Sequence, residues 1–140
     1  MTTIAYKDGI IAYDSLLTRS GVITDSNYNK SFKVNNIFYF LTGAVCDYKE
    51  FLNVASGKQK QRDDIKLEVE CFTVIGKDVF LCAIDDEYWK SPIIKSTAIG
   101  SGRDFAYAAM DCGCSAKEAV KIACNRDIYT GGKIRTYKIE

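Results

Sequence analysis

The first fourteen residues constrain the fold most, because they predict a β-hairpin built from core strands. Residues 3–6 and 10–13 are rich in apolar and β-branched side chains, and Asp8-Gly9 lies between the two runs. An Asp-Gly pair favours a two-residue turn, since both turn positions need positive φ. The chain is therefore expected to begin with two paired antiparallel strands.

Thr2 stands at the open end of this hairpin. A small residue in second position lets methionine aminopeptidase remove Met1, which would leave Thr2 with a free α-amine beside its hydroxyl. Such an amine has a pKa of about 8 and can take the proton of the hydroxyl. A two-residue turn places Thr2 opposite Ser15, with Asp14 one residue away. This end of the hairpin is a candidate active site.

Composition excludes several classes of function. The 140 residues suit a single domain (1–140) with its own core. Lys plus Arg number 19 and Asp plus Glu 18, so no basic surface for nucleic acid or anionic lipid is expected. No apolar run reaches the ~20 residues of a membrane span, and no signal peptide is evident, which predicts a cytoplasmic protein. Histidine is absent, so acid–base chemistry needs an amine, a carboxylate or a hydroxyl.

The cysteines lack the paired C-x-x-C spacing of a zinc site. Most fall in apolar strand or helix patterns, where a free cysteine behaves as a small hydrophobic residue. We interpret them as reduced core thiols rather than as a disulfide framework. They are Cys46, Cys71, Cys82, Cys112, Cys114 and Cys124.

Further strands are predicted where β-rich runs are separated by turn residues. The segment 15–29 has few apolar residues and is expected to be a loop or an irregular extension of the second strand. Pro92 places its strand at a sheet edge, because proline cannot donate to a neighbouring strand. The predicted strands cover 30–34, 37–41, 67–75, 79–84, 88–94, 97–99 and 133–139.

Three helices are predicted from capping-box patterns, in which a polar residue is followed three positions later by an acidic one. The middle helix is expected to bury Phe105, Ala108, Ala109 and Cys112. The order of strands, one helix, strands, two helices and a strand predicts an α+β fold with antiparallel sheets. The three capping pairs are Asp47 with Glu50, Ser101 with Asp104, and Ser115 with Glu118.

Five groups of short motifs follow one another along nearly the whole chain. They are 2–4 with 7–9 and 14–15, then 27–32, 41–47, 99–102, and 126–127 with 130–132. In this order the set resembles proteasome β-subunits and the bacterial proteolytic subunit HslV. The resemblance implies the N-terminal-nucleophile (Ntn) hydrolase fold, an αββα sandwich of two antiparallel sheets between helical layers. The region 57–67 is too short for the second helix of that family, so one helical layer is expected to be reduced.

The resemblance also implies roles for individual residues. Thr2 matches the nucleophile, and its own amine takes the hydroxyl proton. Lys30 matches the lysine whose charge favours a neutral amine and a more acidic hydroxyl. Asp14 would hold Lys30 by a charge-assisted hydrogen bond, and the backbone N–H of Gly43 would form the oxyanion hole.

Other matching residues surround this centre. Ser101, Asp127 and Thr130 match an accessory network around the amine of the nucleophile, and the family usually has serine where this chain has Thr130. The backbone of Thr18 matches a position that pairs with an extended peptide. The side chains of Leu41 and Val45 match the walls of an apolar specificity pocket.

The function that the resemblance implies is a threonine peptidase, activated by removal of Met1, without a metal or an organic cofactor. The implied partners are a peptide or protein substrate, further copies in a ring or stacked dimer, and an ATP-dependent unfoldase. Nucleic acid and membranes are not expected partners. Two alternatives stay open: a small-molecule amidase, and a catalytically silent module for assembly or partner binding, which the short hairpin and the missing helix favour.

Overall fold

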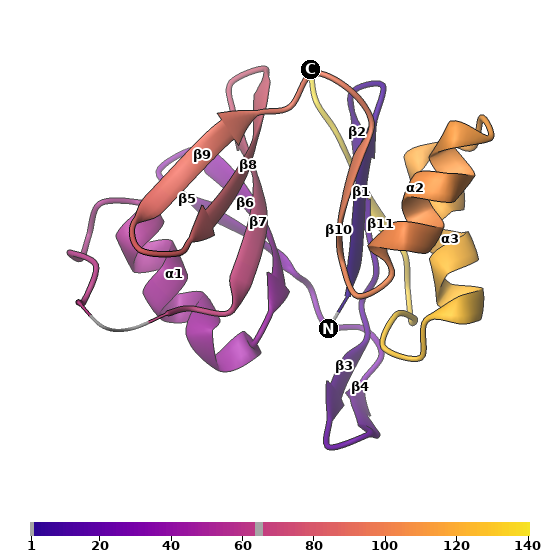
Figure 1. Ribbon diagram of the computed structural model, residues 1–140, viewed down its shortest axis with the longest axis horizontal. Helices are drawn as coiled ribbons and strands as arrows, with labels where there is room; N and C mark the ends of the chain where they lie inside the picture. Colours follow the sequence, from indigo (N-terminus) through magenta and orange to yellow (C-terminus); the bar gives the residue numbers. More distant parts are fainter. Residues whose placement is uncertain (1, 64–65) are drawn as a thin grey trace. The chain divides into compact units, whose positions relative to one another are not determined.

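The computed structural model describes residues 2–63 and 66–140. These residues form two compact units, Met1–Lys30 with Ile94–Glu140 and Ser31–Ile93, which are described one at a time. Figure 1 shows their strands and helices. The expectation of one domain stays a prediction.

The first unit contains a four-stranded antiparallel sheet in the order β10-β1-β2-β11. The predicted hairpin β1–β2 is confirmed, with positive φ at Asp8 (50°) and Gly9 (79°). Ile4 lies opposite Tyr13, the register of a two-residue turn. The strands are β1 Thr3–Lys7, β2 Ile10–Tyr13, β10 Thr97–Gly100 and β11 Arg135–Lys138.

Two helices, α2 (Arg103–Asp111) and α3 (Ala116–Arg126), pack on this sheet. Their shared core consists mainly of alanine, so helix and strand backbones can lie close together. The core residues are Ala5, Ala12, Ala98, Ala106, Ala109, Met110, Ala116, Ala119 and Val120. Small side chains thus decide how near the helices come to β1, the strand that follows Thr2.

The buried face of α2 differs from the prediction. Phe105 is 40% exposed and Cys112 is exposed, whereas Ala106 and Met110 are buried. Against an alanine-lined sheet the helix presents its small residues, so the largest apolar side chain is left outside. The periodicity of α2 alone could not show this.

The segment 15–29 is also more regular than expected. It contains a second hairpin, β3 (Leu17–Arg19) with β4 (Val22–Asp25), closed by positive φ at Ser20 (51°) and Gly21 (78°). Every residue of β4 is exposed. The loop prediction was wrong here because exposed strands carry no apolar alternation.

The second unit is a five-stranded antiparallel sheet in sequence order, from β5 to β9. The turn between the first two of these strands has positive φ at Asn35 (52°) and Asn36 (64°). Pro92 lies in the edge strand β9, as expected. The strands are β5 Ser31–Val34, β6 Ile37–Gly43, β7 Val69–Ile75, β8 Asp78–Ile84 and β9 Tyr88–Pro92.

The short helices of this unit follow β6 directly: the 3₁₀ helix η1 (Val45–Asp47) and α1 (Tyr48–Ala55). Tyr48 donates a hydrogen bond to the Leu41 carbonyl at 3.2 Å, and Phe51 is fully buried. The hydrogen bond ties the start of α1 to β6, and the burial of Phe51 anchors the helix in the core of this unit. No helix in the described residues is long and apolar enough to cross a membrane.

Only one of the three predicted capping boxes forms. Ser115 accepts from the Glu118 backbone, and Glu118 accepts from the Ser115 backbone, at the start of α3. Asp47 makes no cap bond and instead accepts from the Glu68 backbone N–H at 3.0 Å. Ser101 does not cap α2, whose N-cap residue is Gly102. An acidic residue three positions on is therefore not sufficient for a cap.

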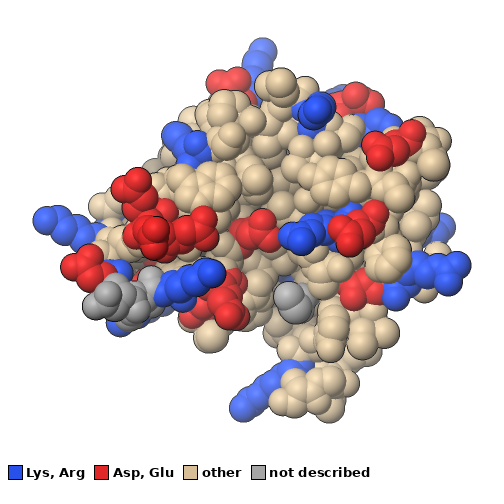
Figure 2. Space-filling view, in the orientation of Figure 1, with Lys and Arg blue, Asp and Glu red and all other residues tan. Residues whose placement is uncertain are grey.

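All six cysteines are free thiols. Cys71 and Cys82 are buried, as expected, but Cys46 and Cys112 are exposed. Charged side chains of both signs lie on the face in Figure 2, and the net charge of the chain is +1. The prediction of α+β architecture with antiparallel sheets is confirmed.

Candidate active site

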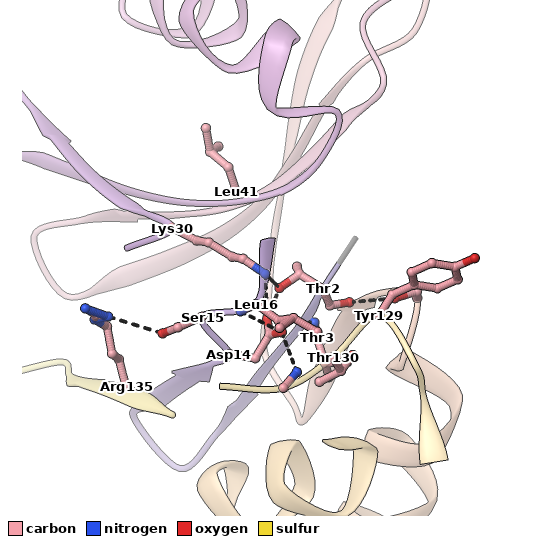
Figure 3. A network of polar contacts seen from close by, with 12 residues as sticks. Thr2, Thr3, Asp14, Ser15, Leu16, Lys30, Leu41, Tyr129, Thr130 and Arg135 are labelled. Atoms are coloured by element: carbon pink, nitrogen blue, oxygen red, sulfur yellow. Dashed lines mark hydrogen bonds and ion pairs between the residues drawn. The ribbon is translucent and has the colours of Figure 1, made fainter. Parts of the chain in front are cut away.

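Three buried polar side chains meet at the open end of the first hairpin (Figure 3). Lys30 Nζ lies 2.8 Å from Asp14 Oδ1 and also donates a hydrogen bond to Thr2 Oγ1. The Thr2 hydroxyl in turn donates to Asp14 Oδ1. Thr2 and Asp14 are fully buried and Lys30 is 1% exposed. The three residues thus form a closed triangle of charge-assisted hydrogen bonds.

The hairpin register brings Thr2 and Asp14 together. Beyond the last ladder pair, Ile4 with Tyr13, the Asp14 backbone N–H donates to the Thr3 carbonyl at 3.3 Å. Thr2 immediately precedes β1 and Asp14 immediately follows β2. The shortness of the hairpin therefore does not separate Thr2 from Asp14.

Backbone N–H groups fix the Asp14 carboxylate. Oδ1 accepts from Thr3 N at 3.3 Å, and Oδ2 accepts from Gly131 N at 3.0 Å and from Leu16 N at 3.4 Å. Burial raises the pKa of Asp14, while the charge and hydrogen bond of Lys30 act against that rise. The same burial lowers the pKa of Lys30, opposed by the Asp14 carboxylate. The Lys30 side chain is thus held beside the Thr2 hydroxyl although burial disfavours its charged form.

A second polar network surrounds Asp127. Its Oδ2 accepts from Ser101 Oγ at 2.5 Å and from Thr130 Oγ1 at 2.5 Å. Ser101 Oγ also lies 3.3 Å from the Thr2 carbonyl oxygen. The hydroxyl of Ser101, predicted to cap a helix, is therefore committed to the surroundings of Thr2. The structure brings all three predicted accessory residues together.

Two residues that the sequence did not single out complete this network. Thr3 Oγ1 lies 2.7 Å from Thr130 Oγ1. A Cβ at Gly102 would lie 2.1 Å from Thr3 Oγ1 and 3.1 Å from Ala123 Cβ, so a side chain there would displace the Thr3 hydroxyl. Thr3 and Thr130 are 127 positions apart, and no local pattern could have linked them.

Arg135 on β11 is a further contact that was missed. Its Nη1 donates to Ser15 Oγ at 3.2 Å, and its Nη2 donates to Asn27 Oδ1 at 2.9 Å. These bonds tie the residue after Asp14 to the segment that leads to Lys30. The alternating pattern of 133–139 predicts only a strand and contains no signal for this role.

The other four predicted residues lie on β3 and in the second unit. Thr18 lies in β3, opposite Ile23. Leu41, Gly43 and Val45 belong to the second unit. A Cβ at Gly43, where φ is 120°, would lie 1.9 Å from the Glu68 carbonyl oxygen, so only glycine fits there. The roles of these four residues in substrate and oxyanion binding stay predictions.

No group of three or more cysteine, aspartate or glutamate side chains within 2–63 and 66–140 is placed to hold a metal ion. The polar atoms gathered around Thr2 are hydroxyls, carboxylates, one lysine amine and backbone groups. Such a set can move protons and stabilise charge, which is what attack by a hydroxyl requires.

Comparisons with known proteins show the fold. No family model matches the chain, and no curated protein matches it either. Two solved structures of BPH from Thiobacillus denitrificans, one in complex with epoxomicin, each align over 99% of this chain and 98% of theirs with a TM-score of 0.70. Their sequences are 16% and 18% identical to this one.

Eukaryotic HslV from Trypanosoma brucei aligns over 97% of both chains, with a TM-score of 0.67 and 19% identity. The chain therefore has the fold of the HslV- and proteasome-like Ntn hydrolases, which confirms the predicted fold class. The resemblance in the sequence is confirmed at the level of the fold.

Proposed function

We propose that this protein is a threonine-nucleophile amide hydrolase, acting as a proteasome-like peptidase once the bond between Met1 and Thr2 is cut. One observation carries the proposal. The Thr2 hydroxyl is buried and hydrogen-bonded to both Lys30 Nζ and Asp14 Oδ1, on a chain with the fold of HslV. A threonine with a purely structural role beside a strand does not require a buried ion pair at its hydroxyl.

The first step is removal of the hydroxyl proton. The free α-amine of Thr2, with a pKa of about 8, takes the proton directly or through a water molecule. The Lys30 ammonium beside Oγ1 stabilises the developing negative charge on that oxygen. Asp14 holds Lys30 in place and is itself held by three backbone N–H groups.

The second step is acyl transfer. Oγ1 of Thr2 attacks the carbonyl carbon of the substrate, and the Gly43 backbone N–H stabilises the oxyanion. The intermediate collapses to an ester on Thr2, and the α-ammonium returns its proton to the leaving amine. Water then hydrolyses the ester and regenerates the hydroxyl.

The network around Asp127 orients the α-amine in this proposal. Ser101 Oγ lies 3.3 Å from the Thr2 carbonyl oxygen and 2.5 Å from Asp127 Oδ2. It therefore lies beside the backbone of the residue whose amine must act as base. Thr130 supplies the second hydroxyl donor to Asp127.

The proposed substrate is an extended peptide with an apolar side chain. The Thr18 backbone would pair with that peptide, and Leu41 and Val45 would line the pocket for its side chain. Epoxomicin, which the BPH structure holds, is accordingly a suitable probe. We further propose that copies of the chain assemble as a ring or stacked dimer; a monomer in light scattering at micromolar concentration would contradict this. A partner unfoldase stays a prediction.

The decisive experiment compares two chain ends. Protein that starts at Thr2 and protein that retains Met1 are verified by intact mass, then incubated with epoxomicin and with a fluorogenic peptide amide. Label and turnover are expected only with the free Thr2 end, with loss of both in Thr2→Ala and partial activity in Thr2→Ser. Thr136→Ala, an exposed threonine in the same sheet, is the matched control.

Equal reactivity of both chain ends, or retention of label by Thr2→Ala, would overturn the proposal. A folded protein with a free Thr2 end and no reactivity would favour the second candidate, a silent module for assembly or partner binding. One observation supports that candidate: the described residues between Gly57 and Val69 form no helix.

A further inference from the structure

The residue after the proposed nucleophile is as deeply buried as the nucleophile itself. Thr3 is fully buried, and its side chain hydroxyl lies 2.7 Å from Thr130 Oγ1. We propose that Thr3 is a positioning residue, which holds Thr130 and through it Asp127. This inference rests on the proposed function, since it assigns Thr3 a part in preparing Thr2 for attack.

A count of protons sets the direction of the hydrogen bonds. A threonine hydroxyl has a single proton to donate. Thr130 gives its proton to Asp127 Oδ2 at 2.5 Å, because the carboxylate oxygen can only accept. The contact of 2.7 Å between the two threonine hydroxyls must then be a donation from Thr3 to Thr130. The network therefore runs from Thr3 to Thr130 to Asp127.

Thr3 also connects the two networks that surround Thr2. Its backbone N–H donates to Asp14 Oδ1 at 3.3 Å, and its carbonyl accepts from Asp14 N at 3.3 Å. Its side chain reaches the Asp127 network on the other side. A single residue thus couples the carboxylate that pairs with Lys30 to the carboxylate bound by Ser101.

The position of the Thr3 hydroxyl is sterically determined. A Cβ at Gly102 would meet Thr3 Oγ1 at 2.1 Å and Thr130 Oγ1 at 3.1 Å. Glycine at this position leaves room for the pair of hydroxyls where α2 begins. The backbone of Thr3 is held as well, since it pairs with Gly100 on β10.

The expected consequence concerns turnover and not substrate binding. Without a donor at position 3, the Thr130 hydroxyl keeps only its bond to Asp127, so its rotation is less restricted and that bond is less well oriented. Thr3 is fully buried, so its loss should leave substrate affinity unchanged. One neutral hydrogen bond corresponds to about a fivefold to tenfold change in rate.

The test is a double-mutant cycle in protein with a verified Thr2 end. Thr3→Val removes the hydroxyl and is expected to lower kcat about fivefold to tenfold with unchanged KM, and Thr3→Ser should restore most of that loss. In a Thr130→Val background, Thr3→Val should have no further effect, because the hydroxyl that links Thr3 to Asp127 is already absent. Thr136→Val is the matched control, since it makes the same change on an exposed residue of β11.

Equal effects of Thr3→Val in both backgrounds, or a change in KM alone, would contradict the inference. A second readout needs no activity: methyl scalar couplings report the χ1 angle of Thr130. We expect one rotamer in the wild type and in Thr3→Ser, and averaging in Thr3→Val. A wild type without turnover would count against the proposed function, while unchanged couplings in Thr3→Val would count against the inference.

Discussion

Two ion pairs in this protein have similar lengths and opposite surroundings. Lys30 and Asp14 are 2.8 Å apart with side chains 2% and 0% exposed, whereas Arg62 and Glu50 are 2.5 Å apart with side chains 55% and 21% exposed. In the surface pair, hydrogen bonding lowers the pKa of Glu50 and raises that of Arg62. In the buried pair, desolvation shifts both pKa values the other way. In the surface pair each residue stabilises the charged form of the other. In the buried pair, desolvation disfavours the charged form of both residues.

The buried shifts determine how stability depends on pH. Burial raises the pKa of Asp14, so its contribution to stability is full below the ordinary value of 3.8 and is lost as pH rises through the folded pKa. Burial lowers the pKa of Lys30, so its contribution is full above 10.5 and is lost as pH falls through the folded pKa. Desolvation therefore acts against the charged form of both residues, and a pair buried at this cost points to a role in function.

The largest expected effect comes from breaking the buried pair on one side. Lys30→Met leaves the Asp14 carboxylate buried without its cation, and we expect the free energy of unfolding to fall by about 3–5 kcal/mol. Labelling of Thr2 should also be lost, since no cation remains beside its hydroxyl. Urea denaturation and epoxomicin labelling at neutral pH measure the two effects. Labelling at the wild-type rate in Lys30→Met would remove Lys30 from the mechanism.

Replacing both charges sharpens the comparison. The double variant Asp14→Asn with Lys30→Met removes the two desolvated charges, and we expect the free energy of unfolding to rise by about 1–4 kcal/mol at neutral pH. Labelling of Thr2 should stay absent. A double variant less stable than the wild type would show that the pair stabilises the fold, and that a functional reason for it is not required.

The two serines with similar sequence contexts should respond differently. Ser115→Ala removes a capping bond at the start of α3 and should lower the free energy of unfolding by about 1 kcal/mol without changing the labelling rate. Ser101→Ala removes a bond to Asp127 and should slow labelling about tenfold. Thermal unfolding of both variants measures the change in stability, and labelling kinetics measure the change in reactivity of Thr2. Equal labelling rates in the two variants would mean that Ser101 does not contribute to the reactivity of Thr2.

The smallest effect is expected at the surface pair. Glu50→Gln should leave the urea midpoint of unfolding and the labelling rate unchanged, because solvent screens exposed charges. A loss of stability comparable to that of Lys30→Met would mean that burial is not what distinguishes the two pairs.

The sequence predicted those parts that depend on local chemistry. Asp8-Gly9 determines the turn, the turn determines the register, and the register carries Asp14 to Thr2. Lys30 was found only through resemblance to a family, because nothing near it in the chain indicates that a lysine side chain is buried. Its burial follows from the packing of distant segments, and a single sequence does not specify such packing.

Two of the errors in prediction, at Ser101 and on α2, have the same origin. Ser101 and Ser115 both precede an acidic residue by three positions, yet only Ser115 caps a helix. The hydroxyl of Ser101 is engaged by Asp127, which lies 26 positions along the chain. The buried face of α2 was misassigned because an alanine-lined sheet selects small residues over Phe105. In each case a tertiary contact overrode a correct local pattern.

Trapping the acyl-enzyme shows whether the Thr2 hydroxyl beside Lys30 is the nucleophile. Protein with a free Thr2 end is mixed with an activated peptide ester, quenched in acid within the first turnover, and digested for mass spectrometry. We expect an acyl group on the peptide that begins with Thr2, formed by the wild type and absent from Lys30→Met. An acyl group on any other residue, or equal acylation of Thr2 in Lys30→Met, would contradict this expectation.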